Sequence, residues 1–133
     1  MSREILFRGL AGSVWRYGDY ETYTFNKKVS QICTKKKEHY TVDDTVGQYT
    51  GRKDKIGKRV FEGDLVKFTH YGDVHTAKIV FNEGTCGFEI WYTSVVGAYG
   101  EKATHKANFY DKEIEVIGNI HQNPELLTPW RGI

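Results

Sequence analysis

Apolar and polar residues alternate along the middle of the chain in the way typical of β-strands. Residues 65–69 and 77–81 are separated by turn-forming residues at 71–73, which predicts a hairpin over residues 65–81. Residues 86–92 place an apolar side chain at every second position and predict a strand with one apolar face. Residues 114–120 predict the last strand.

The first part of the chain has shorter runs of the same kind. Residues 14–25 predict a hairpin, because Gly18 and Asp19 in their middle are typical turn residues. Residues 97–106 predict a long loop, since they contain glycine and lack alternation. The remaining expected elements are short: strands at 5–7, 29–34 and 46–49, a turn or helical turn at 42–46, and a helical turn starting at 123–125.

These patterns predict an all-β fold, either a barrel or a strongly bent antiparallel sheet. About seven or eight short strands are separated by turns, and no long helix is expected. The side chains expected to be mostly buried are Val66, Phe68, Ile79, Phe81, Phe88, Ile90, Val116 and Ile120.

The composition is that of a globular protein, with 39% hydrophobic and 27% charged residues. A net charge of +2 is too small to predict nucleic-acid binding by itself. Cys33 and Cys86 form no CxxC pair, and no signal peptide or membrane span is expected. We therefore expect a cytoplasmic protein of the host cell with two free thiols, with Cys86 in the core and Cys33 unassigned.

Two blocks of the sequence carry a more specific pattern. Residues 46–66 read VGQYTGRKDKIGKRVFEGDLV, and residues 116–127 read VIGNIHQNPELL. Both blocks resemble the signature of the YopX family of phage and prophage proteins. Arg52 stands where the family has an apolar residue, and Ile56 stands where it usually has Asn, which tolerates a tight turn better than Ile does.

The resemblance covers nearly the whole chain and implies an SH3-like barrel and a phage or prophage origin. It implies no established activity, catalytic residue or cofactor. On this basis we expect a barrel core over residues 46–127, with an N-terminal β extension at 1–45 packing on it and a tail at 128–133.

Residues that carry chemistry elsewhere have simpler interpretations in this chain. Glu62 and Asp64 are spaced for acid–base work, but a bend at Gly63 with Asp64 bonding backbone amides explains them better. His70 and His75 flank a turn, and we expect them to be exposed polar residues, because zinc would need a third ligand. We expect no enzymatic activity, no metal and no cofactor.

A cluster of basic residues is the strongest candidate for binding. Basic side chains neutralise phosphates, and aromatic rings stack on bases, so the cluster suits a nucleic acid. A solvated loop remains the alternative interpretation, because Asp54 and other acidic residues dilute the charge. The candidate nucleic-acid-binding residues are Tyr49, Arg52, Lys53, Lys55, Lys58 and Arg59, to which Lys35, Lys36 and Lys37 can add.

The function that fits these observations best is a non-catalytic binding module that acts on nucleic acid or on a host protein. The alternative is a structural or assembly protein that self-associates. Biochemical activity, the ligand and the stage of the phage cycle do not follow from the sequence.

Self-association is a testable expectation. Residues 90–96 are apolar on both faces, and such a strand must be covered on both sides. A homo-oligomer or the N-terminal extension would supply the second layer. If a homo-oligomer supplies it, light scattering at high protein concentration is expected to report a mass above that of the monomer, and a monomer would remove the idea.

Overall fold

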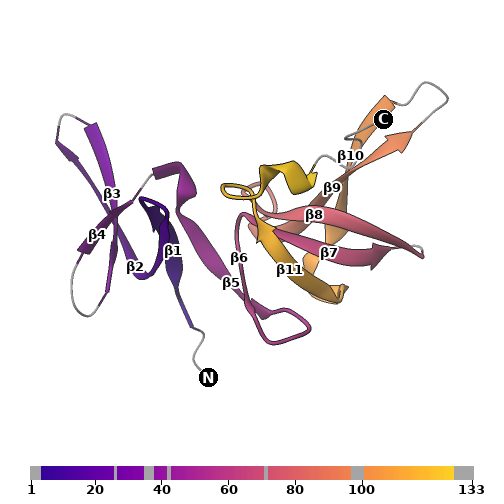
Figure 1. Ribbon diagram of the computed structural model, residues 1–133, viewed down its shortest axis with the longest axis horizontal. Helices are drawn as coiled ribbons and strands as arrows, with labels where there is room; N and C mark the ends of the chain where they lie inside the picture. Colours follow the sequence, from indigo (N-terminus) through magenta and orange to yellow (C-terminus); the bar gives the residue numbers. More distant parts are fainter. Residues whose placement is uncertain are drawn as a thin grey trace. The chain divides into compact units, whose positions relative to one another are not determined.

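Strands form nearly all the regular structure in the computed structural model, which describes residues 4–25, 27–34, 38–41, 43–70, 72–96 and 101–127. Three short 3-10 helices are the other regular elements of these residues. The chain divides into two compact units, Met1–Arg52 and Lys53–Ile133 (Figure 1). Within the described part of the chain, no helix is long and apolar enough to cross a membrane.

The first unit is built on an antiparallel sheet with the strand order β4-β3-β2-β1-β5. β1 pairs with β2 through a tight turn at Gly12 and Ser13, where Gly12 has a φ of +67°. β5 pairs with the other side of β1. The elements are β1 (Phe7–Ala11), β2 (Val14–Phe25), β3 (Lys27–Cys33), β4 (Glu38–Thr41), the 3-10 helix η1 (Asp43–Thr45) and β5 (Gly47–Lys53).

The predicted hairpin turn at Gly18–Asp19 is wrong, because β2 runs through both residues without interruption. β2 changes its partner here: Gly18 pairs with Phe7 in β1, and Asp19 pairs with Cys33 in β3. A Cβ atom at Gly18 would overlap the carbonyl oxygen of Cys33. Glycine is therefore needed at this position for the close approach of two strands, a role that strand glycines often have.

The second unit is built on an antiparallel sheet with the strand order β10-β9-β8-β7-β11. Strands β7 to β10 follow one another as neighbours, whereas β11 returns to pair with the free side of β7. The elements are β6 (Arg59–Phe61), β7 (Asp64–His70), β8 (Asp73–Asn82), β9 (Gly87–Val96), β10 (Glu101–Asn108), the 3-10 helix η2 (Phe109–Asp111), β11 (Ile114–Asn119) and the 3-10 helix η3 (Pro124–Leu127).

The hairpin predicted over residues 65–81 is confirmed, with Leu65 paired to Lys78 and His70 paired to Asp73. The helical turn predicted at residues 123–125 is confirmed as η3. The loop predicted at residues 97–106 is wrong from Glu101 onward, where β10 pairs with β9. Residues 35–37, 97–100 and 128–133 lie outside the described residues.

The core of the second unit lies on one face of its sheet. Val66, Phe68, Ile79 and Ile90 are buried there as predicted, together with Phe109 from η2. The prediction was wrong for Phe81, which is 38% exposed at the end of β8 and contacts Phe88 with 5.2 Å between ring centroids. The other predicted core residues are half-buried: Phe88, Val116 and Ile120.

The prediction that Cys86 belongs to the core is wrong, since this residue is exposed in the turn between β8 and β9. Its φ of 54° is the only positive value at a non-glycine residue in the described part of the chain. The alternation that ends at Tyr92 therefore starts at Phe88, after the turn. Cys33 is half-buried at the end of β3.

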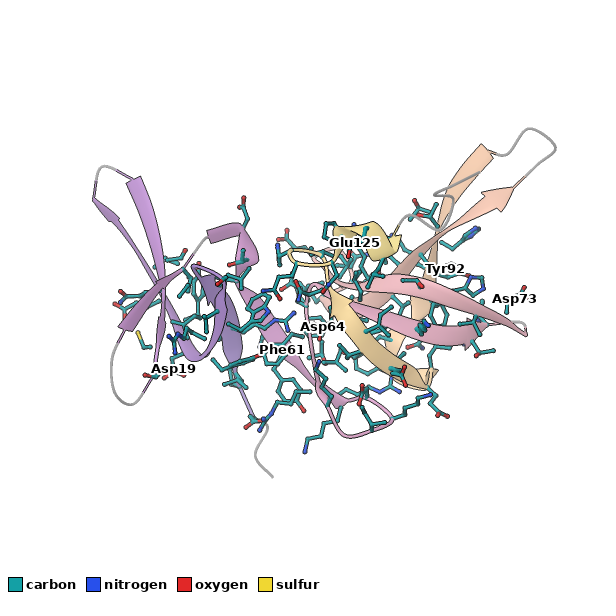
Figure 2. The ribbon with its side chains drawn as sticks, in the orientation of Figure 1. Asp19, Phe61, Asp64, Asp73, Tyr92 and Glu125 are labelled. Atoms are coloured by element: carbon teal, nitrogen blue, oxygen red, sulfur yellow. The ribbon has the colours of Figure 1, made fainter. Side chains whose placement is uncertain are left out.

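The sequence Glu62-Gly63-Asp64 forms the predicted bend at the start of β7. Asp64 is 1% exposed, and its carboxylate accepts a hydrogen bond from the backbone N–H of Phe61 at 2.7 Å (Figure 2). Gly63 has a φ of +89°. Its N–H donates a hydrogen bond to the carbonyl oxygen of Ile79, and its own carbonyl oxygen accepts one from the N–H of Ile120. The interpretation of this motif as a structural bend is confirmed.

The all-β fold class is confirmed, and neither sheet closes into a barrel. The sequence analysis placed a boundary after residue 45, whereas the compact units of the structure divide after Arg52. β5 begins after the predicted boundary, but it pairs with β1 and so belongs to the sheet of the first unit.

The close approach at Gly18 makes a prediction about stability. Gly18→Ala is expected to lower the free energy of unfolding by about 1–3 kcal/mol, because its methyl group forces β2 and β3 apart. Gly87→Ala is the matched control, since its Cβ would meet its nearest neighbour at 3.9 Å. Urea unfolding of both variants provides the measurement, and equal stabilities would contradict the role given to Gly18.

Candidate nucleic-acid interface

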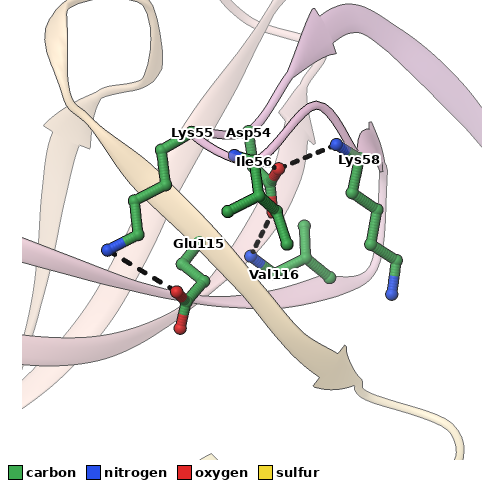
Figure 3. Close-up of polar contacts among 6 residues, drawn as sticks. All are labelled: Asp54, Lys55, Ile56, Lys58, Glu115 and Val116. Carbon is green, nitrogen blue, oxygen red and sulfur yellow. Dashed lines mark hydrogen bonds and ion pairs between the residues drawn. The ribbon is translucent and has the colours of Figure 1, made fainter.

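The basic cluster identified in the sequence is held in place by one buried carboxylate. Asp54 is 7% exposed, and its Oδ1 accepts hydrogen bonds from the backbone N–H groups of Ile56 at 3.0 Å and Lys58 at 2.8 Å. Its Oδ2 accepts from the N–H of Val116 in β11 at 3.0 Å (Figure 3). We call residues 53–59 the basic turn.

Backbone hydrogen bonds complete the basic turn. The backbone N–H of Asp54 donates to the carbonyl oxygen of Lys58 at 2.7 Å, and the N–H of Gly57 donates to the carbonyl oxygen of Asp54 at 3.0 Å. Gly57 has a φ of +91°, so the left-handed conformation falls on glycine and not on the neighbouring Ile56. Ile56 is therefore compatible with this turn, and its side chain is 72% exposed.

The pKa of Asp54 is lower than its ordinary value of 3.8. Burial acts to raise this pKa, but hydrogen bonds from the backbone of Val116, Lys58 and Ile56, together with the charge of Lys58, outweigh it. Asp54 is consequently ionised at neutral pH and faces inward, so it reduces the charge of the exposed surface less than an exposed carboxylate would.

The basic side chains of the turn are exposed, as a binding surface requires. Lys53, Lys55, Lys58 and Arg59 all lie at the surface of the second unit. Lys55 is paired with Glu115, with 3.5 Å between its Nζ and the Oε2 of the glutamate. The structure therefore brings four of the six predicted residues together.

Tyr49 cannot have the stacking role that the sequence predicted for it. Its side chain is 6% exposed, because Tyr49 lies on the buried side of β5. A ring that is buried to this extent cannot stack on a base. Arg52 is half-buried in the same strand and also belongs to the first unit.

A second group of basic residues surrounds Trp91, and the sequence analysis missed it. Strand pairing places Lys78, Trp91 and Lys106 side by side on β8, β9 and β10. The Nζ atoms of Lys106 and Lys78 lie 4.9 and 5.9 Å from the centroid of the Trp91 ring. The three residues are far apart in the sequence, so only the strand register reveals this arrangement.

The indole of Trp91 is oriented by Glu89. Trp91 Nε1 donates to the Oε1 of Glu89 at 2.9 Å, and the Nδ2 of Asn82 donates to the same oxygen at 3.0 Å. The hydrogen bond from Trp91 is the main cause of the lowered pKa of Glu89, and those from Asn82 and Thr85 add to it. Glu89 therefore stays ionised and fixes the ring.

Two hollows among the described residues of the second unit lie beside these basic groups. One has a volume of about 330 Å³ and is lined by residues that include Lys55 of the basic turn, Lys67, Glu113 and Glu115. The other, of about 230 Å³, is lined by Thr76, Lys78, Trp91, Tyr92, Thr93, Thr104 and Leu127.

The histidines that flank the turn before β8 are half-buried, which corrects the expectation that they are exposed. His70, His75 and His105 all contact the ring of Tyr92, with centroid distances of 6.1, 4.7 and 5.1 Å. Among the described residues, no group of three or more His, Cys, Asp or Glu side chains has a geometry that would hold a metal ion. These histidines extend the aromatic packing of the core.

Comparison with protein-family models relates the chain to a known family. The family model described as YopX protein matches residues 12–128, which is most of the chain. No curated protein matches the sequence.

The buried carboxylate of Asp54 generates a prediction about stability and pH. Asp54→Asn is expected to lower the free energy of unfolding by about 1–3 kcal/mol at neutral pH, because the amide group of Asn cannot accept hydrogen bonds at both of its ends. A lowered pKa means that the ionised carboxylate stabilises the fold above its ordinary pKa, and that this stability is lost as pH falls through the folded pKa.

The stability difference between the wild type and Asp54→Asn should therefore shrink below about pH 4. Urea unfolding from pH 7 to pH 3 measures it. Asp73→Asn removes an exposed carboxylate from the same unit and serves as the control. A difference that stays constant with pH would show that the charge of Asp54 is unimportant.

Proposed function

The chain belongs to the YopX family, and on this premise we propose that it is a phage- or prophage-encoded binding module that contacts nucleic acid through the basic turn and performs no chemistry of its own. The observation that carries the proposal is a turn whose backbone is fixed from inside by Asp54 while its cations face outward.

A fixed turn suits the binding of a polyanion for an energetic reason. A flexible loop would lose backbone entropy on binding, whereas this turn is already ordered by its hydrogen bonds. The cations act on phosphates through charge, which gives affinity without sequence specificity. Binding should be weak at physiological salt, because few cations are involved and Glu115 already neutralises Lys55.

A host protein is the second candidate ligand, and Ile56 is the observation that favours it. An apolar side chain that is 72% exposed at the tip of a cationic turn would suit a partner with an acidic surface and a small apolar pocket. Such a partner would depend on Ile56, whereas phosphate binding would not. Self-association remains the alternative function.

The proposal predicts how single charges contribute to binding. Lys58→Ala is expected to weaken binding to oligonucleotides of any sequence and to reduce the slope of log K against log salt by about 0.7 on single strands. Lys55→Ala should have a smaller effect, because Lys55 is already paired with Glu115 and contributes less to the attraction of phosphates. Fluorescence anisotropy titrations at several salt concentrations provide the measurement.

Arg16→Ala is the control, since Arg16 is an exposed cation of the first unit. It should leave the affinity nearly unchanged, as should Ile56→Ala. A flat titration of single-stranded and double-stranded oligonucleotides at low salt would end the nucleic-acid proposal and leave a protein partner as the leading candidate.

A further inference from the structure

The sheet of the second unit has a face opposite its core that combines lysine, threonine and tryptophan side chains with the carboxylates of Glu89 and Glu115. We call this the outer face and define it by Lys67, Thr76, Lys78, Trp91, Thr93, Thr104 and Lys106. We propose that the outer face binds single-stranded nucleic acid, with one base stacked on Trp91 and the flanking phosphates held by the lysines. This inference rests on the proposed function, because it assumes that the ligand is a nucleic acid.

The ring of Trp91 has the properties of a stacking platform. It is half-buried, so it is part of a surface and not of the core. The hydrogen bond to Glu89 at 2.9 Å and that from Asn82 to Glu89 at 3.0 Å hold its orientation. A base that stacks on a fixed ring costs little side-chain entropy, and this contact tolerates any base.

The Nζ atoms of Lys106 and Lys78 lie over the Trp91 ring, 4.9 and 5.9 Å from its centroid, so a base that stacks on the ring must displace these flexible side chains toward its own flanking phosphates. Lys78 and Lys106 flank Trp91 on the two adjacent strands, at about 4.8 Å from strand to strand. Lys67 extends the basic surface to β7 and is exposed. Two ammonium groups beside one ring suit a chain that carries a phosphate on each side of every base.

Threonine hydroxyls add hydrogen-bonding groups to the same surface. Thr93 pairs with Thr104 across β9 and β10, and both line the 230 Å³ hollow with Trp91 and Thr76. Hydroxyl groups commonly donate to phosphate and sugar oxygens. Leu127 of η3 contributes an apolar side chain to the hollow, which would suit the edge of a base.

The outer face and the basic turn are parts of one surface. Lys67 of the outer face and Lys55 of the basic turn line the same 330 Å³ hollow. Glu113 and Glu115 line it as well, and Glu115 is paired with Lys55 at 3.5 Å. These carboxylates repel phosphates, and Glu115 is the cross-strand neighbour of Lys67, so they weaken the attraction for a nucleic acid between the basic turn and the outer face.

A single strand fits these groups better than a duplex or an acidic peptide. Stacking on Trp91 needs a base that is free of its own neighbours, which a duplex does not offer. An acidic peptide would use the lysines but would gain nothing specific from the ring. The fixed Trp91 is therefore the feature that separates the three ligands.

The test compares two labelled oligomers by fluorescence anisotropy at low salt. One is an oligothymidine of about 12 nucleotides, and the other has the same phosphates but no bases. Trp91→Ala is expected to weaken binding of the oligothymidine about fivefold or more and to leave the abasic oligomer unaffected. Trp91→Phe should retain most of the affinity, because it keeps an aromatic face.

Two controls support this comparison. Arg16→Ala removes an exposed cation of the first unit and should not distinguish the two oligomers. Circular dichroism and the urea midpoint show whether each Trp91 variant is folded, and Trp91→Leu, which keeps an apolar side chain but no aromatic face, replaces Trp91→Ala if that variant is unfolded. The inference is supported if a fully folded Trp91→Ala binds oligothymidine more weakly than Trp91→Phe does.

The remaining outcomes overturn the inference in distinguishable ways. If both oligomers bind equally well and only Lys58→Ala weakens them, the proposed function stands and the outer face is not a stacking surface. If polyglutamate of matched charge competes as well as oligothymidine, the outer face binds acidic polypeptides. If neither oligomer binds, the proposed function fails together with this inference.

Discussion

The basic turn depends on the carboxylate of Asp54, which provides the acceptor for three backbone N–H groups. Two of these groups belong to the turn and the third belongs to β11, so one side chain both shapes the turn and attaches it to the sheet. Hydrogen bonds to a charged acceptor are stronger than neutral ones, and here they outweigh the desolvation of a buried carboxylate. The arrangement separates the charges, with the anion inside and the lysines outside.

Much of the second unit follows from local sequence patterns, because its strands alternate clearly and its turns are short. The hairpin of β7 and β8 is the best case. β10 was missed because its core-facing positions include His105 and Ala107, which are polar or small and produce no apolar alternation. Gly18 was misread as a turn residue because the identity of a glycine does not say whether it provides a positive φ or space for another strand.

The candidate site was predictable only in part, for a related reason. The clustering of cations at residues 53–59 is visible in the sequence, but the role of Asp54 depends on Val116, which is 62 positions away. Tyr49 was assigned to the site by proximity along the chain, whereas the alternation of β5 turns its side chain inward. The group around Trp91 depends on the register of three strands, which no short motif encodes.

The strand order of the second unit has a consequence for how the chain folds as it is synthesised. Strands β7 to β10 pair with their neighbours in sequence and can form as soon as each one leaves the ribosome. The free side of β7 must wait for β11, which follows β10 in the sequence, and until then its edge is open to pairing with other chains. Before β11 is available, the hydrogen bond from Val116 to Asp54 cannot form, so the sheet and the basic turn are completed by the same strand.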